Sequence, residues 1–191
     1  IYEMARMIRG HGMVREISSS KYQNQYIKKY KNLSPKFIFL YPGFNFRSNE
    51  LNAVLGLSQL KFLKKNNLKR SKNLKYFLKK IDKEKYFVDF KLEGNSNYAF
   101  PVILKKFSIK NRNKLENLLK KHGVEFRRGS VGGGNQLKQP YLKKYFNERI
   151  NNKLKNTNHI HDCGYYIGNY PTLENSKIDK IVKILNSLLL S

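Results

Sequence analysis

The sequence is poor in several residues that would define a class of protein. A single cysteine, Cys163, excludes a disulfide framework and a cysteine-based metal cluster. The apolar run at residues 37–40 is far shorter than the ~18 residues that suggest a membrane-spanning helix. No signal-peptide pattern is present, so we expect a protein of the reducing cytoplasm with no membrane partner.

Acidic residues are also scarce. Thirteen Asp and Glu stand against 39 Lys and Arg, which gives a formal net charge of +26. Such a balance is typical of nucleic-acid-binding proteins. However, 30 of the 39 cations are lysines, and Asn, Ile, Tyr and Phe are abundant while alanine occurs three times. These are the preferences of A/T-rich codons, so we expect lysines dispersed over solvated faces and no specific nucleic-acid partner.

The order of apolar and polar residues predicts a mixed α/β chain. A length of 191 residues and 40% apolar residues are sufficient for one domain and a small second one. The predicted helices are 2–9, a long or kinked helix over 48–80, 111–122, 152–161 and 175–190. The predicted strands are 37–41, 86–88, 97–104, 124–127 and 165–168, with a polar loop over 13–35. We place a domain boundary inside the long helix, which divides the chain into 1–75 and 76–191. Because the chain opens within an amphipathic helix that has no N-cap or initiator Met, we expect it to be part of a larger protein.

The segment Gly43-Phe44-Asn45-Phe46-Arg47-Ser48 carries the strongest local signal. A glycine turn brings Asn45 and Arg47 to a helix N-terminus, where free N–H groups and the helix dipole favour an anion such as phosphate. The alternative is a capped helix start with an asparagine in its turn. Composition alone favours that alternative.

A glycine-rich loop at 129–135 could also hold a phosphate, and Arg127 and Arg128 before it could clamp a diphosphate. The loop lacks the GK[ST] ending of a P-loop, so a flexible surface loop with two exposed arginines is the alternative. His11 lies between two glycines and could line a site or an exposed turn. His159 and His161 are two residues apart on a predicted helix and face different sides, so no metal site is expected.

The stretch GFNFRSNELNAVLGLSQLKFL, residues 43–63, resembles the DegT/DnrJ/StrS family of pyridoxal-phosphate (PLP) sugar aminotransferases. The family pattern G-Y-N-x-R-x-x-E-x-x-A-A-x-G-x-x-Q-L-x-x-L is met at nearly every fixed position. The segment 4–16 resembles the helix and loop shortly after the family's GEGG turn, and the segments 97–104, 123–142 and 161–173 resemble its C-terminal domain. The similarity therefore spans essentially the whole chain. The resemblance implies the C-terminal part of a fold-type-I PLP enzyme, with a long connecting helix and a small α/β C-terminal domain.

The resemblance also implies what this chain does not contain. The family's PLP lysine precedes the segment that matches residues 4–16, so no catalytic residue is expected here. The segment EFRRGSVGGGNQLKQPYL, residues 125–142, is closer to the NDP-4-keto-6-deoxyhexose 3-dehydratase branch, in which a histidine replaces that lysine.

The resemblance assigns roles to individual residues as well. Asn45 would reach the PLP phosphate across a homodimer interface, and Arg47 would either steady that loop or bind the phosphate. The nucleotide-sugar pocket would be bordered by four residues: His11, Arg127, Arg128 and Asn135. The implied function is aminotransfer or 3-dehydration of an NDP-4-keto-6-deoxy sugar for surface polysaccharide or lipopolysaccharide. The alternatives are a non-catalytic truncated or split product and a basic nucleic-acid-binding module.

Overall fold

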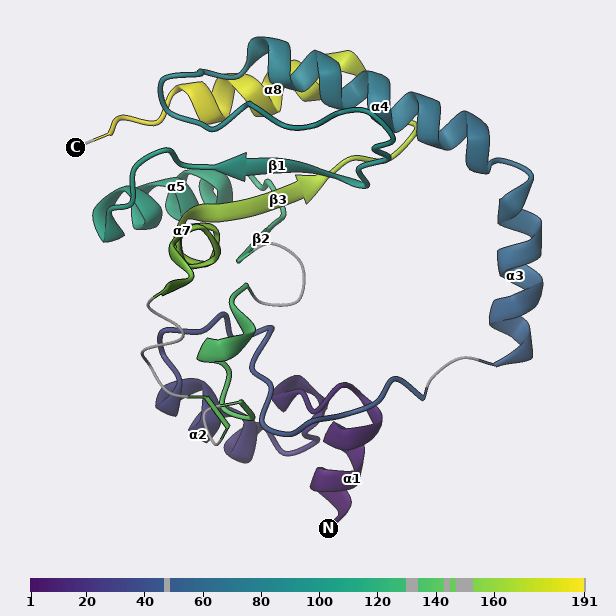
Figure 1. Cartoon of the computed structure of the whole chain (residues 1–191), viewed down its shortest axis with the longest axis vertical. Helices are drawn as coiled ribbons and strands as arrows, with labels where there is room; N and C mark the ends of the chain where they lie inside the picture. Colours follow the sequence, from purple (N-terminus) through teal and green to yellow (C-terminus); the bar gives the residue numbers. More distant parts are fainter. Residues whose placement is uncertain (47–48, 130–133, 143–144, 147–152, 191) are drawn as a thin grey trace. The chain divides into compact units, whose positions relative to one another are not determined.

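The structure, a computed structural model, contains two compact units, each built from two separate stretches of the chain (Figure 1). Unit 1 comprises Ile1–Gly56 and Val131–His161, and unit 2 comprises Leu57–Ser130 and Asp162–Ser191. The residues described are 1–46, 49–129, 134–142, 145–146 and 153–190. The two consecutive domains expected from the sequence, 1–75 and 76–191, stay a prediction about the complete protein.

Unit 1 contains short helices around a small apolar core. Its elements are α1 (Tyr2–Arg9), η1 (Val14–Glu16), α2 (Ser20–Lys29), the first part of α3 (Glu50–Leu60), η3 (Gln136–Lys138) and most of α7 (Lys155–Cys163). The core consists of Met7, Val14, Ile17, Leu33 and Ile38.

Two predictions for unit 1 were wrong. The stretch expected as a loop contains α2, a polar helix with no buried residue. Only Tyr26 and Ile27 of α2 pack against the core. Two apolar residues among so many polar ones do not produce a helical periodicity that the sequence could show. The predicted strand at 37–41 forms only an isolated bridge, between Phe39 and Met13.

The predicted helix over residues 48–80 is two helices. α3 ends at Leu60, and α4 (Leu63–Lys80) begins after a break at residues 61–62. α4 buries Leu74, Phe77 and Leu78 in unit 2, whereas α3 buries none of its residues. The hydrophobic spacing predicted one long or kinked helix over this range, and the structure has a full break at residues 61–62.

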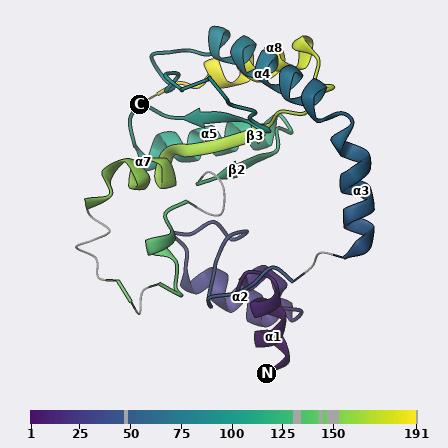
Figure 2. The ribbon, with the colours of Figure 1, turned by 45° about the vertical axis from the view of Figure 1, so that its right-hand side comes forward.

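Unit 2 is a three-stranded antiparallel sheet covered by helices. The strands β1 (Ala99–Ile103), β2 (Phe126–Arg128) and β3 (Gly164–Gly168) have the order β1-β3-β2, with β3 in the centre. α4 and α8 (Asn175–Asn186) lie side by side over the sheet, and α5 (Ile109–Lys121) also packs on α8 (Figure 2). The predicted strand at 86–88 was wrong, because Tyr86 forms only an isolated bridge with Leu104.

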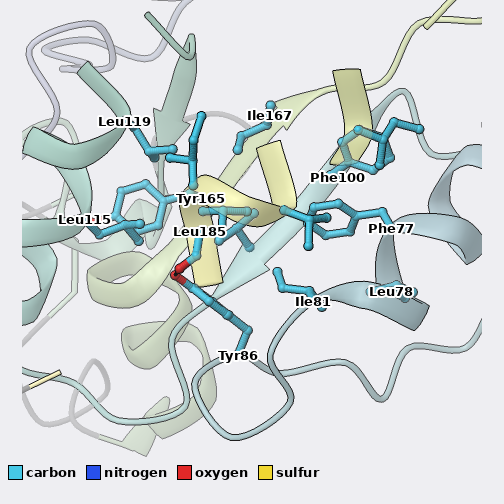
Figure 3. Packing of buried hydrophobic residues seen from close by; sticks show 14 of the residues in the cluster. Phe77, Leu78, Ile81, Tyr86, Phe100, Leu115, Leu119, Tyr165, Ile167 and Leu185 are labelled. Atoms are coloured by element: carbon cyan, nitrogen blue, oxygen red, sulfur yellow. Dashed lines mark hydrogen bonds between the residues drawn. The ribbon is translucent and has the colours of Figure 1, made fainter. Parts of the chain in front are cut away.

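The main core lies between the sheet and these helices (Figure 3). The rings of Phe77 and Phe100 stack with centroids 4.6 Å apart, joining α4 to β1. The Tyr86 hydroxyl donates to the Leu185 carbonyl oxygen at 2.8 Å, so this fully buried tyrosine is satisfied. The core therefore fixes β3 and, through its pairing with β3, the strand β2, which carries the candidate residues of unit 2.

Candidate functional site

Two glycines allow two chain segments of unit 1 to cross at very short range. Gly12 has φ +73°, and a Cβ built there would lie 1.8 Å from the carbonyl oxygen of Tyr41. A Cβ at Gly43 would lie 2.3 Å from the nitrogen of Gly12. Only glycine fits at either position, so the Gly10–Gly12 turn and the Tyr41–Asn45 segment are held against each other.

This crossing brings together two of the residues predicted for the site. His11, with φ 65°, donates its backbone N–H to the carbonyl oxygen of Phe44 at 2.8 Å. Gly10 and Asn45 form an antiparallel bridge, which places His11 and Asn45 at the same point of the crossing. Both residues are exposed, and neither side chain has a hydrogen-bond partner among the residues that the structure describes. An imidazole and an amide are therefore available to a ligand here.

Polar contacts fix α1, which leads into the crossing. Arg6 donates from Nε to the carbonyl oxygen of Glu16 at 2.9 Å. Glu3 accepts hydrogen bonds from the backbone and the hydroxyl of Ser18, and these bonds hold the pKa of its carboxyl below the usual value. The first turn of α1 is thereby tied to the chain that follows the crossing.

Asn135 lies elsewhere in unit 1 than His11 and Asn45. It is buried, and its side chain and backbone N–H form local hydrogen bonds. Its Oδ1 accepts from the N–H of Leu137 at 2.9 Å, and its Nδ2 donates to Oδ1 of Asn158 at 2.7 Å. Its backbone N–H donates to Nδ1 of His161 at 3.1 Å. These bonds position the end of the glycine-rich loop, where Gly134 has φ 80°.

Gln139 was not predicted as a site residue, yet it ties this segment to the first stretch of unit 1. Its side chain is fully buried. Oε1 accepts from the N–H of Phe39 at 3.0 Å, and Nε2 donates to the carbonyl oxygen of Phe37 at 2.9 Å. A buried amide that bonds two backbone groups 100 residues away gives no local sequence signal. In the sequence, only the resemblance of residues 125–142 to the family pointed to Gln139.

The two predicted arginines belong to unit 2, on adjacent positions of β2. Arg127 pairs with Glu125 at 2.9 Å and lies opposite Tyr166 of β3. Arg128 lies opposite Tyr165 and pairs with Glu116 of α5 at 3.4 Å, with about a fifth of its side chain exposed. Neighbouring residues of a strand point to opposite faces, so the two guanidinium groups do not form a single clamp.

Part of the predicted site lies outside the residues that the structure describes. Arg47 and most of the glycine-rich loop lie outside the described residues. Within the described ranges, no group of His, Cys, Asp and Glu has a metal-binding arrangement. No helix in the described part of the chain is both long and apolar enough to span a bilayer.

Comparison with known proteins identifies the relatives of this chain. It is 32% identical over 187 residues to a GDP-4-keto-6-deoxy-D-mannose 3-dehydratase of Escherichia coli O55:H7, and 29% identical over 190 residues to one of Yersinia pseudotuberculosis. In both cases the match covers 97% of this chain and 47% of the relative. The chain thus spans about half the length of the curated relatives that it matches.

Solved structures agree with the sequence comparison. The E. coli GDP-4-keto-6-deoxy-D-mannose-3-dehydratase with bound hydrated PLP matches at 28% identity and a TM-score of 0.61, over 96% of this chain and 47% of the other. An aminotransferase from Psychrobacter cryohalolentis matches in fold at 22% identity and a TM-score of 0.55, over 94% of this chain and 46% of the other. The predicted fold class is confirmed, since the chain has an α/β fold that corresponds to part of the PLP-dependent transferase fold.

The family model matches residues 1–186, nearly the full length of the chain. The chain therefore belongs to the DegT/DnrJ/EryC1/StrS aminotransferase family.

Proposed function

We propose that the complete protein is a PLP-dependent 3-dehydratase of a GDP-4-keto-6-deoxy sugar in surface polysaccharide or lipopolysaccharide biosynthesis. The observation that carries this proposal is the match, over 97% of the chain, to two relatives with that activity in their names. Aminotransfer at the 4-keto carbon is the competing outcome within the same family. The chain described here would be the C-terminal half of the enzyme.

The residues of the glycine crossing fit a phosphate-bearing cofactor. The Asn45 amide and the His11 imidazole are exposed, and no described residue accepts from or donates to either of them. Amide N–H groups are suitable donors to a phosphate, and the close approach at Gly12 and Gly43 keeps these donors in place. PLP, when bound, supplies the electron sink that stabilises a carbanion on the substrate. Asn45 and Arg47 would hold its phosphate, and His11 would face the sugar nucleotide.

We also propose that the complete enzyme is a homodimer. Every residue of α3 is exposed, although the helix is apolar on all sides. Phe44 and Phe46 are exposed as well, and their rings stack 4.9 Å apart on either side of Asn45. A helix that is apolar all round requires cover from more than one direction. Cover of Phe44 and Phe46 by a second copy would place Asn45 in the interface, where it could reach the partner's cofactor.

The reaction is tested with the complete protein, PLP, glutamate and GDP-4-keto-6-deoxymannose. Dehydration removes the C3 hydroxyl of the sugar, whereas aminotransfer replaces the C4 carbonyl oxygen with an amine. Mass spectrometry and NMR of the product distinguish these outcomes. An aminated product would reject dehydration and keep the family chemistry, and an unchanged sugar nucleotide would reject the proposed substrate.

Two substitutions test the residue roles. Asn45→Ala should weaken PLP retention by about 1.5–3 kcal/mol, roughly ten- to a hundred-fold, because a hydrogen bond to a charged group is lost. Arg127→Ala should leave PLP binding near normal and lower kcat/KM for the nucleotide sugar. Cofactor titration and steady-state kinetics measure both effects. If Arg127→Ala loses PLP while Asn45→Ala retains it, the roles are reversed.

The dimer is tested by light scattering of the complete protein. Val54→Glu places a charge on the exposed apolar face of α3 and should dissociate the dimer or raise its Kd at least tenfold. Lys65→Glu on α4 is the matched control. It changes the net charge by more than Val54→Glu does, but at an exposed polar position outside the apolar face of α3. A wild-type protein that stays monomeric at micromolar concentration would reject the proposal.

A further inference from the structure

The strand β2 is held in the sheet from one side only. Its three residues pair with β3, and β3 lies between β2 and β1, so no strand borders the other side of β2 in the described part of the chain. The next residue, Gly129, has φ 83° and opens the glycine-rich loop. A short edge strand that ends at a glycine is fixed by few backbone hydrogen bonds. The orientation of Arg127 therefore depends on the side-chain contacts of β2 as well.

Arg128, the neighbour of Arg127, makes such a contact with α5. Its Nη1 lies 3.4 Å from Oε1 of Glu116, and less than a fifth of either side chain is exposed. The hydroxyl of Tyr165 donates to the same Oε1 at 3.1 Å, and Tyr165 lies opposite Arg128 in the register of β2 and β3. One carboxylate thus joins α5, β2 and β3. We call Glu116, Arg128 and Tyr165 the β2 anchor.

The charges and hydrogen bonds of the β2 anchor are balanced. Burial and the Glu116 carboxylate raise the pKa of Tyr165, so its hydroxyl stays protonated and donates to Glu116. The guanidinium of Arg128 keeps its charge at any pH at which the protein is folded. Breaking an ion pair that is largely withdrawn from water leaves one charge without compensation. A substrate phosphate that took Arg128 would leave Glu116 in that state.

Arg127 has different surroundings. Neighbouring residues of a strand point to opposite faces, so its side chain leaves β2 on the face opposite to the β2 anchor. It pairs with Glu125 at 2.9 Å, and the Glu125 side chain is 76% exposed. An exposed ion pair of this kind contributes little to stability. An anionic ligand can therefore take the place of Glu125 at Arg127.

We propose that the β2 anchor positions β2 so that Arg127 meets the nucleotide sugar, and that Arg128 is a positioning residue that does not touch the substrate. The inference rests on the proposed function, in which Arg127 takes part in the use of the nucleotide sugar. It differs from the expectation that both arginines border the substrate pocket. Arg128 acts through its neighbour, because a shift of either residue of this short strand moves the other.

The test combines steady-state kinetics with urea unfolding of the complete protein. Arg128→Met and Glu116→Gln should each lower kcat/KM for the GDP sugar about tenfold, because both break the same ion pair. Added to Arg127→Ala, Arg128→Met should lower kcat/KM no further, since its effect passes through Arg127, but it should still lower the urea midpoint. Lys120→Met is the matched control, because Lys120 is an exposed cation on the same helix as Glu116.

The kinetics of the combined variant decide between the roles of Arg128. If Arg128→Met lowers kcat/KM by the same factor with and without Arg127→Ala, Arg128 acts directly on the substrate or only on general stability, and the inference is overturned. An unchanged kcat/KM in Arg128→Met overturns it too, as does a loss in Lys120→Met that is equally large.

Hydrogen exchange of the β2 amides provides a measurement that does not depend on activity. Exchange should accelerate about tenfold in Arg128→Met and in Glu116→Gln, but not in Lys120→Met. Unchanged exchange in both variants would overturn the inference even in an enzyme that acts on a GDP sugar. Absence of turnover in the wild type would instead reject the proposed function, and the exchange rates would still decide whether the β2 anchor holds the strand.

Discussion

Replacing Gln139 with methionine should separate the segment around Asn135 from the first stretch of unit 1. Methionine has nearly the same volume but can form neither of the two hydrogen bonds of Gln139, to the Phe39 N–H and the Phe37 carbonyl oxygen. The side chain is fully buried, so water cannot easily replace it. Each unsatisfied backbone group costs about 1–3 kcal/mol, so the two groups together give a loss of roughly 2–6 kcal/mol for Gln139→Met.

Urea unfolding and amide hydrogen exchange of the complete protein measure this loss. Exchange at Phe39 should accelerate by roughly a hundredfold for a local loss of about 3 kcal/mol. Gln25→Met is the matched control, because Gln25 is exposed on α2 and its side chain forms no hydrogen bond with the residues that the structure describes. The reasoning is refuted if the two variants differ by less than about 0.5 kcal/mol, a difference smaller than one net hydrogen bond.

Three further results are expected. Gly12→Ala should destabilise the protein by about 3 kcal/mol or more, because its Cβ would collide with the Tyr41 carbonyl. Gly123→Ala should cost only about 1–2 kcal/mol, because Gly123 also has a positive φ but a Cβ there would meet no other atom. Similar urea midpoints for the two variants would contradict this. Burial raises the pKa of Cys163 to about 11, so a thiol reagent near pH ~8 should label it only after unfolding, and rapid native labelling would refute that assignment. Borohydride reduction of this chain with PLP should leave no stoichiometric pyridoxyl-lysine by mass spectrometry, and such a label would show that it holds a PLP lysine of its own.

Elements with strong periodic patterns were predicted well from the sequence. α1, α5, β1, β3 and α8 were all found within a few residues of their expected ranges. The errors concern elements that depend on contacts with distant parts of the chain. Phe39 and Tyr86 each form a single isolated bridge among the described residues. The segments around them are rich in residues that favour β-structure, but they do not form strands. α2 shows the opposite case, since a few contacts with a small core stabilise a helix in a mainly polar segment.

The candidate site was only partly predictable for the same reason. The sequence shows the glycines on both sides of His11 and before Asn45. It does not show that the two segments cross, because that depends on how the chain between them folds. The opposite orientations of Arg127 and Arg128 follow from strand alternation once β2 is placed.

The central position of β3 has a consequence for the synthesis of the protein. β1 and β2 emerge from the ribosome first, yet each pairs only with β3, and α8 follows β3 near the end of the chain. The sheet of unit 2 therefore cannot close until Gly164–Gly168 has been translated. Until then the apolar faces of α4 and α5 remain open to chaperones and to other nascent chains. A premature stop codon before β3 would leave both earlier strands without their partner.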